Sequence, residues 1–221
     1  MTTSGSYDNT TTGYTLVRDA YVLAGMVDEG EPLSAEQWVS GKRILNEMMS
    51  LLSIHKGLWL VDDITITLTP GTTSYTIAVG DTVDSPTPMR VTHARSVYST
   101  THHIPMEVVS REDYMGIPNK ILQSPALQVY YDKGHGELYV WPTGTSTYKT
   151  IIITAQRPVQ DFDDQGNTPD FPKEWTLAIK YNLAEMLAPG ANVSPMVSQK
   201  AKELLATVAV FDGEETSLYI R

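Results

Sequence analysis

The period of the hydrophobic residues changes twice along this chain, and that change constrains the fold more than any single motif does. Apolar residues recur with a helical period of about 3.6 over residues 14–59, alternate in much of residues 60–158, and return to the helical period over residues 172–211. Helices at both ends are most simply joined into one body with the strands as an insertion. We therefore predict the α+β fold class: a helical bundle from the N- and C-terminal helices with an inserted antiparallel β domain, either a sandwich or a partly open barrel.

The first helical part, residues 14–59, contains two predicted helices. The first ends near Gly25, which suits a C-cap, and the second begins at a capping box formed by Ser34 and Gln37. One side of the second helix is apolar at helical spacing, which is typical of a core or of an interface between subunits. That stripe consists of Trp38, Leu45, Met48, Met49 and Leu52.

The β part, residues 60–158, is predicted from alternation and from turn residues. In ITITLTPGTTSYTI, apolar residues alternate with threonines on the way to Pro70-Gly71, which predicts a half-buried hairpin. A short helical turn is expected after Ser110, a suitable N-cap with Asp113 three residues later. Further strands are predicted over residues 89–98, 104–109, 127–131, 138–141 and 150–156.

The second helical part, residues 172–211, contains the most sharply bounded predicted helix. It should begin at Pro172 and stop before Pro189-Gly190, a length of about five turns. Its apolar residues cover more than one face, so we expect it to be buried on several sides as a central helix. A last helix from Ser194 has an apolar stripe made of Val197, Ala201, Leu204, Val208 and Phe211.

Three polar segments complete the division of the chain. Residues 1–13 are rich in Thr, Ser, Gly and Asn, and we predict a flexible arm. Residues 159–171 are predicted to be an acidic linker between the β part and the second helical part. Residues 212–221 are predicted to be an exposed tail, acidic at first and apolar near its end.

Composition and charge exclude several classes of protein. The 221 residues are 41% hydrophobic and 19% charged, as is typical of a globular protein. The chain has no cysteine, which excludes disulfides, thiol catalysis and thiolate metal sites. No segment approaches the ~20 apolar residues of a membrane helix, and no signal-peptide pattern is seen, so we expect a soluble protein made in a cytoplasm. A net charge of −10 predicts that the chain does not grip DNA.

Candidate metal ligands are sparse. The adjacent His102 and His103 would point to opposite faces of a strand, which disfavours a shared metal. The acidic loop after residue 160 has Asp161, Asp163, Gln165 and Gly166 at the spacing of the first half of a calcium loop, although Gln165 replaces the usual Asp or Asn. Because a proline, Pro172, stands where a bidentate glutamate belongs, a solvated loop is favoured over a cation site.

Candidate catalytic groups are equally sparse, since the chain has none of the common nucleophile, phosphate-binding or metalloprotease motifs. The adjacent carboxylates of Asp62-Asp63 and Asp163-Asp164 would point apart in an extended chain, which disfavours shared acid–base work. Aromatic residues surround one predicted hairpin, and they are more typical of a core and an interface than of a sugar platform. They are Tyr130, Tyr131, Tyr139, Trp141 and Tyr148.

The order of these segments resembles the head-to-tail adaptor proteins of tailed phages, the connectors or tail accessory factors, especially those of short-tailed phages. LVRDAYVLAGMVDEGEPLSAEQWVSGKRILNEMMSLLSIHKGLW is similar to their two opening helices with an acidic loop and a final Leu58-Trp59 step. ITITLTPGTTSYTI resembles their first hairpin, and LYVWPTGTSTYKTIIITAQRPVQDFDDQGNTPDFPKEWTLAIKYNLAEMLAPG resembles their later strands, polar linker and Pro-started helix. Residues 82–123 show no such resemblance.

The resemblance implies a structural virion protein at the neck of the particle, made in the host cytoplasm. It implies a ring of twelve copies beneath the portal protein ring, which extends the DNA channel, helps to retain packaged DNA and gives a platform for tail proteins of the nozzle or tube. DNA would pass the lumen without specific binding. Neither an enzymatic activity nor a catalytic residue, cofactor or metal is implied, and no membrane is involved.

Two sets of residues are the candidates for these contacts. The end of the tail is the candidate for docking on the portal, through the apolar Leu218, Tyr219 and Ile220 and the final Arg221, since such tails climb onto the portal in the family that the chain resembles. The helical stripes are candidates for a ring interface or for the subunit core: Trp38, Leu45, Met49, Trp175, Ile179, Leu204 and Val208.

Two other classes of function stay open at this point. The β part could be a carbohydrate-binding module of a tail or capsid decoration protein, which would require exposed aromatic residues in a groove. A hydrolase of cell wall or polysaccharide would rest only on carboxylates whose separation the sequence does not fix.

Overall fold

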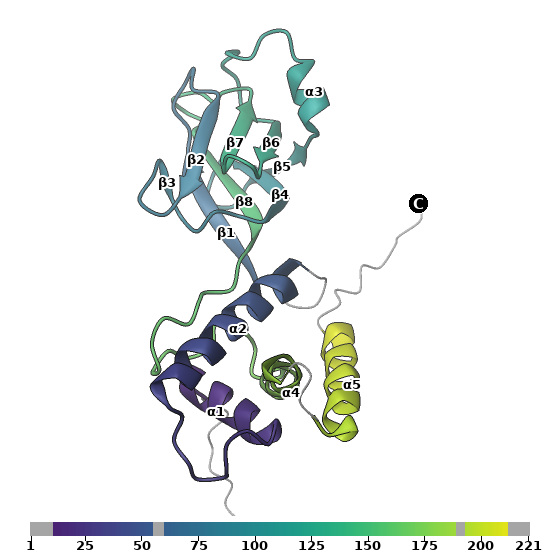
Figure 1. Cartoon of the computed structure of the whole chain (residues 1–221). Helices are drawn as coiled ribbons and strands as arrows, with labels where there is room; N and C mark the ends of the chain where they lie inside the picture. The colour runs from purple at the N-terminus through teal and green to yellow at the C-terminus, as the bar shows by residue number, and fades with distance from the viewer. Residues whose placement is uncertain (1–10, 55–59, 189–192, 212–221) are drawn as a thin grey trace, which may run out of the picture. The chain divides into compact units, whose positions relative to one another are not determined.

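The computed structural model describes residues 11–54, 60–188 and 193–211 (Figure 1). The described residues form five helices and eight strands, so the fold is mixed α and β. The chain divides into two compact units, one made of Met1–Trp59 and Val159–Arg221 and the other of Leu60–Pro158. We call them the helical unit and the β unit and consider each by itself.

The helical unit contains α1 (Gly13–Leu23), α2 (Ala35–Ile54), α4 (Trp175–Leu187) and α5 (Pro195–Phe211). The helix α4 packs against α1, α2 and α5, and it therefore occupies the centre of this unit. Its apolar residues lie on several faces for that reason, as the sequence predicts. The fully buried side chains of the unit include Leu16, Leu45, Phe162, Trp175 and Ile179.

Local signals place the ends of α1 and α2. Gly25 follows α1 with a φ of 69°, a left-handed conformation that suits glycine. The capping box before α2 is confirmed, because Gln37 N donates to Ser34 Oγ at 3.2 Å and Ser34 N donates to Gln37 Oε1 at 2.8 Å. Each interaction satisfies a backbone group that the helix leaves without a partner.

The predicted start of α4 at Pro172 is wrong, since the helix begins at Trp175. Trp175 N donates to Pro172 O and Thr176 N donates to Lys173 O, each to the carbonyl three residues earlier. Residues 172–174 therefore form a tight turn that leads into a helix of 13 residues, shorter than the predicted five turns. The predicted stop at Pro189-Gly190 lies outside the described residues.

The β unit contains eight strands and the short helix α3 (Arg111–Met115). Its strands are β1 (Leu60–Thr67), β2 (Ser74–Ala78), β3 (Val83–Asp84), β4 (Arg90–Val97), β5 (His103–Val108), β6 (Gln128–Asp132), β7 (Glu137–Trp141) and β8 (Thr150–Arg157). The N-cap predicted at Ser110 is confirmed, and it forms a full capping box: Asp113 N donates to Ser110 Oγ, and the Asp113 carboxylate accepts from Ser110 N.

All eight described strands belong to one sheet, in the order β1-β8-β4-β5-β6-β7-β2-β3. Neighbours are antiparallel except for two parallel pairs, β2 with β3 and β5 with β6. The predicted purely antiparallel domain is therefore wrong at these two pairs. The remaining pairs follow the prediction.

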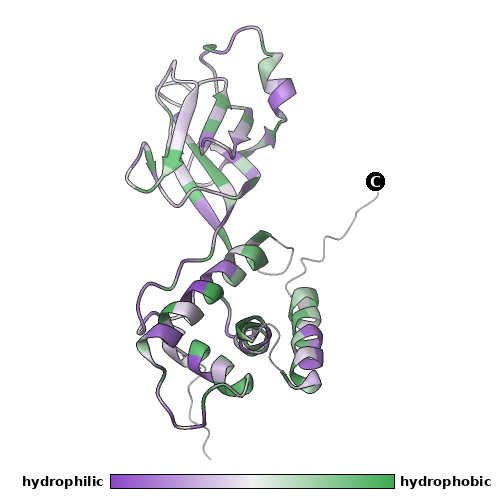
Figure 2. Cartoon of the chain, viewed as in Figure 1, coloured by the Kyte–Doolittle hydropathy of each residue, from purple (hydrophilic) through white to green (hydrophobic). Residues whose placement is uncertain are grey.

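The sheet curls into a nearly closed barrel around a single core, so the barrel of the two predicted alternatives is the correct one. Every second residue of β8 is buried, namely Ile151, Ile153 and Ala155, and these side chains pack with residues from the other strands in one cluster. Figure 2 shows that the strands of this unit carry both hydrophobic and hydrophilic residues. The two end strands, β1 and β3, line one open groove, so the barrel has a single seam where no strand joins them.

The hairpin predicted around Pro70-Gly71 is also wrong. The two strands that flank this turn do not pair with each other, since β1 pairs with β8 and β2 pairs with β7. A turn does form here, with Gly71 at a φ of 86°. It connects β1, at one end of the sheet, to β2, which lies next to β3 at the other end. Sequence-adjacent strands are usually neighbours, but that tendency fails here, because β1 pairs with β8 while β2 lies near the other end of the sheet.

Candidate functional site

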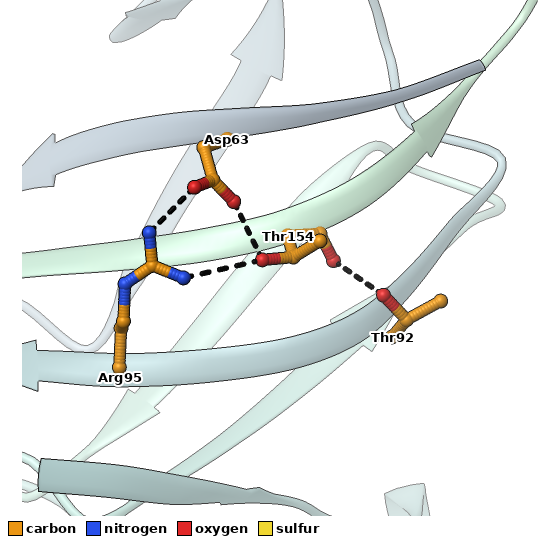
Figure 3. Close-up of polar contacts among 4 residues, drawn as sticks. All are labelled: Asp63, Thr92, Arg95 and Thr154. Carbon is orange, nitrogen blue, oxygen red and sulfur yellow. Dashed lines mark hydrogen bonds and ion pairs between the residues drawn. The ribbon is translucent and has the colours of Figure 1, made fainter. Parts of the chain in front are cut away.

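The most connected polar group on the β unit joins three strands (Figure 3). Asp63 on β1 accepts hydrogen bonds from Arg95 Nη2 on β4 at 2.5 Å and from Thr154 Oγ1 on β8 at 2.6 Å. Arg95 Nη1 also donates to Thr154 Oγ1 at 3.5 Å, and Thr92 Oγ1 donates to the backbone carbonyl of Thr154 at 3.0 Å. The hydrogen bond from Thr154, followed by that from Arg95, lowers the pKa of Asp63 below its ordinary value.

This network links β1, β4 and β8 through their side chains, and its geometry does not suit catalysis. Each oxygen of Asp63 already accepts a hydrogen bond, so the carboxylate is a poor base. The neighbouring Asp62 bonds a different partner, Nε of Arg157 on β8, at 2.5 Å. The two adjacent carboxylates therefore serve separate ion pairs, as expected for an extended chain whose successive side chains point apart.

The acidic loop between β8 and α4 is organised by the side chain of an asparagine. Asn167 Oδ1 accepts from the backbone N–H groups of Asp163 and Asp164, at 2.8 and 2.6 Å. The backbone carbonyl of Asn167 accepts from Gly13 N at 2.8 Å, and that of Gln165 accepts from Tyr14 N at 3.2 Å. The loop therefore attaches to the start of α1 through backbone contacts.

A second contact, which the sequence analysis missed, fixes the same linker to α2. Asn46 Nδ2 donates to the carbonyl of Phe162 at 3.1 Å, and Asn46 Oδ1 accepts from the N–H of Phe162 at 3.0 Å. Lys42, one turn earlier on α2, donates to the carbonyl of Asp163 at 3.0 Å. An isolated Asn in an amphipathic helix gives no signal in the sequence that identifies this partner.

Neither a metal site nor a membrane span is found in the part of the chain that the structure describes. Within that part, His, Asp and Glu side chains form no group of three or more that could hold a metal ion. His102 lies in the turn before β5 with its ring against Tyr98, while His103 begins the strand. Each helix within residues 11–54, 60–188 and 193–211 is too short or too polar to span a bilayer.

The tyrosines near the β6–β7 hairpin pack on one another. The ring centroids of Tyr114, Tyr130 and Tyr139 lie 5.3 to 6.0 Å apart, and Lys120 Nζ lies 4.7 Å from the Tyr114 ring. The hydrogen bond that Tyr139 donates to Glu137 at 2.5 Å, with partial desolvation, raises the pKa of Tyr139 to about 12. This cluster therefore holds α3 against the outside of the barrel.

The other aromatic residues of this region are also used within the chain. Tyr131 packs against the barrel core and donates to the carbonyl of Pro88 at 2.7 Å. Trp141 Nε1 donates to the carbonyl of Asn119 at 2.8 Å, and Tyr148 stacks on Tyr98 with centroids 4.4 Å apart. A carbohydrate-binding face would need a row of aromatic rings that are free to contact a sugar. Because these rings make contacts within the chain, the structure gives no specific support to such a face.

The seven residues that the sequence analysis gave as candidates for a ring interface or for the subunit core all lie in the helical unit. Of the seven, six are buried in the single chain, and Leu204 on α5 is half-buried. The proposed portal-docking residues Leu218, Tyr219, Ile220 and Arg221 lie outside the described residues. Large apolar side chains that remain exposed on the helical unit include Val39 on α2, Leu177 on α4, and Met196 and Val210 on α5.

Together, a helical unit assembled from both ends of the chain, an inserted nearly closed β barrel, and polar groups that bind one another define a structural α+β protein. Comparison with models of known families matches the chain over residues 18–217 to the SU10 adaptor protein family, and the chain belongs to this family. It is thus a phage head-to-tail adaptor, a structural component of the virion neck, as the sequence resemblance predicts. A comparison with curated proteins finds no match.

Proposed function

We propose that this adaptor forms a ring of twelve copies beneath the portal, where it extends the DNA channel, helps to retain packaged DNA and provides a platform for tail proteins. The observation that carries the proposal is the family match over residues 18–217, which includes both units. No catalytic step, cofactor or metal is assigned in this role.

The charge of the chain supports a passage for DNA rather than a binding site. Each copy carries a net charge of −10, so a ring of twelve would carry about −120. Phosphate contacts dominate DNA affinity, and an acidic assembly repels them. DNA can then move through the ring without adhering to its wall.

The helices supply both the frame and the surface for ring contacts in this proposal. The buried residues of α2, α4 and α5 form a bundle that fixes the shape of each copy. The contact between copies would use the exposed apolar side chains on the same helices, Val39, Leu177, Met196 and Val210. A head-to-tail ring requires two different surfaces on each copy, and these side chains come from three different helices.

The tail after α5 is the part that we assign to portal docking, through Leu218, Tyr219, Ile220 and Arg221. Apolar residues at the end of an otherwise acidic segment are suited to anchoring in a pocket of a partner. Deletion of residues 213–221 should leave the fold intact, as judged by circular dichroism, and abolish cosedimentation with the portal ring of the same phage. Unchanged cosedimentation of the folded, truncated protein would overturn this assignment.

A further inference from the structure

The seam of the barrel is an open groove between two strand edges. Among the described strands, β1 and β3 stand at the two ends of the sheet order, so each has a neighbour on one side only. Both line the same groove, which has a volume of about 560 Å³. Its walls are Asp62 to Thr67 on one side and Thr82 to Ser85 on the other.

The register of β1 shows which of its backbone groups face this groove. In an antiparallel pair, opposed residues alternate between hydrogen-bonded and non-hydrogen-bonded pairs. Leu68 N donates to Lys149 O, so the bonded pairs continue at Ile66, Ile64 and Asp62, which share the register with β8. The residues between them, Asp63, Thr65 and Thr67, therefore direct their N–H and C=O groups into the seam.

These edge groups form a row that an added strand could pair with. Six residues of extended chain from Asp62 to Thr67 span about 20 Å, the length of an ordinary strand. Ile66 and Val83, which lie on opposite walls, belong to the barrel core, so an inserted strand would lie directly beside that core. An edge of this length with unpaired backbone is the surface that partners use for strand addition.

The charge of the groove points to the type of partner. Its walls include Asp62, Asp63 and Asp84 and contain neither Lys nor Arg. Arg157 and Arg95 on other strands pair with the first two, which leaves the groove acidic at Asp84. A second copy of this chain, itself at −10, is a poor match for such a surface. A segment from a different protein that carries basic residues fits it better.

We propose that the seam binds an extended, basic segment of a tail protein, which adds a strand to the free edge of β1 and completes the barrel. This inference rests on the proposed adaptor function, and it assigns the contact with the tail to one edge of the β unit. Backbone hydrogen bonds to Asp63, Thr65 and Thr67 provide affinity, while the carboxylate of Asp84 favours a basic side chain.

The first test is hydrogen–deuterium exchange of the portal–adaptor complex, before and after addition of the tail proteins of the same phage. The seam-facing amides of Asp63, Thr65 and Thr67 should exchange freely before addition and become protected afterwards, whereas those of Asp62, Ile64 and Ile66 are already bonded to β8. Protection elsewhere with β1 unchanged would overturn the proposal. Protection of these seam-facing amides before any tail protein is added would also overturn it, because the groove would then hold a second copy or a terminal segment of the chain.

A pair of variants at one position gives the second test. Thr65→Pro removes one seam-facing N–H and leaves the bonds to β8 in place, because proline is tolerated on edge strands. It should weaken tail binding at least tenfold, whereas Thr65→Val keeps the N–H and should bind like the wild type. Equal binding by both folded variants would contradict strand addition. If the wild type binds neither portal nor tail, the adaptor function fails instead, so the two failures are distinguishable.

Discussion

The side chain of Asn46 forms two hydrogen bonds with the backbone of a single residue, Phe162, which lies 116 positions later in the sequence. The amide copies the donor and acceptor pair of a neighbouring strand, and so it satisfies both backbone groups of a residue whose ring is fully buried. The contact fastens the linker from the β unit to α2, and it joins the two parts of the chain that make up the helical unit.

Removal of this amide should destabilise the helical unit. Asn46→Ala leaves the N–H and C=O of Phe162 without partners, and an unsatisfied buried group costs about 1–3 kcal/mol. Urea unfolding followed by tryptophan fluorescence reports on this unit through Trp38 and Trp175. The exposed Gln199, which bonds only Glu203 on the same helix, provides a control, and Gln199→Ala should change stability by less than about 0.5 kcal/mol. Equal stabilities of the two variants would contradict the proposed role of Asn46.

Gly41 should be required where α1 crosses α2. A Cβ at this position would lie 2.3 Å from Val17 Cγ1 and 3.1 Å from Tyr21 Cε2. Alanine favours a helix by about 1 kcal/mol over glycine, but overpacking costs about 1–3 kcal/mol, so we expect Gly41→Ala to be neutral to destabilising rather than stabilising.

The same contact predicts a coupling between the two positions. Val17→Ala removes the clashing methyl group, so it should cost less in the Gly41→Ala protein than in the wild type, as a double-mutant cycle in urea would measure. Gly166→Ala is the matched control, because a Cβ there meets no atom within 4 Å. Additive effects at positions 17 and 41 would show that the helices do not meet closely at Gly41.

The network around Asp63 predicts a pH-dependent contribution to stability. Because the pKa of Asp63 is lowered in the folded chain, its stabilising effect is present above the ordinary value of 3.8 and is lost as pH falls through the folded pKa. Both side chains of the ion pair are partly exposed, so Asp63→Asn should cost only about 0.5–1 kcal/mol at pH 7.

Urea unfolding at pH 7 and at about pH 3 measures this effect. The difference between wild type and Asp63→Asn should shrink at the lower pH, where both side chains approach a neutral state. Asp28→Asn, at an exposed position in the loop after α1, should show a small difference at both pH values. A constant penalty for Asp63→Asn would mean that packing, not charge, is what Asp63 contributes.

Ring formation should depend on exposed apolar residues of the helical unit. Val39 is 61% exposed and Met196 is 77% exposed, so a charge at either position should leave the fold of the single copy intact. Val39→Asp and Met196→Asp should reduce ring assembly on the portal, as measured by analytical ultracentrifugation. Val79→Asp, at an equally exposed valine of the β unit, serves as the control. Normal rings from both helical variants would exclude these side chains from the interface.

Features set by neighbouring residues were predictable from the sequence. The capping boxes of Ser34 with Gln37 and of Ser110 with Asp113 span three residues each, and both are present. The alternation over residues 64–68 also predicted a half-buried strand, and Ile66 and Leu68 are buried while Thr65 and Thr67 are exposed. Each of these patterns depends only on residues that are close together in the sequence, so it can be recognised without knowing which distant residues are in contact.

Pairings between distant residues were not predictable. The strong turn at Pro70-Gly71 suggested a hairpin, yet β1 pairs with β8, some 90 residues later, so a pairing between distant strands overrides the local preference. The fastening of Phe162 by Asn46 depends equally on the tertiary fold. The groove between β1 and β3 exists only once the barrel has formed, and no motif in the sequence indicates it.

The central claim is that this chain is a ring-forming adaptor on the portal, and native mass spectrometry tests it most directly. The purified protein is measured alone and then mixed with the portal ring of the same phage. We predict one saturated complex in which the ring carries as many adaptor copies as it has portal subunits, twelve for a twelve-fold portal. The absence of any bound adaptor, at a salt concentration where both partners are folded, would contradict the account.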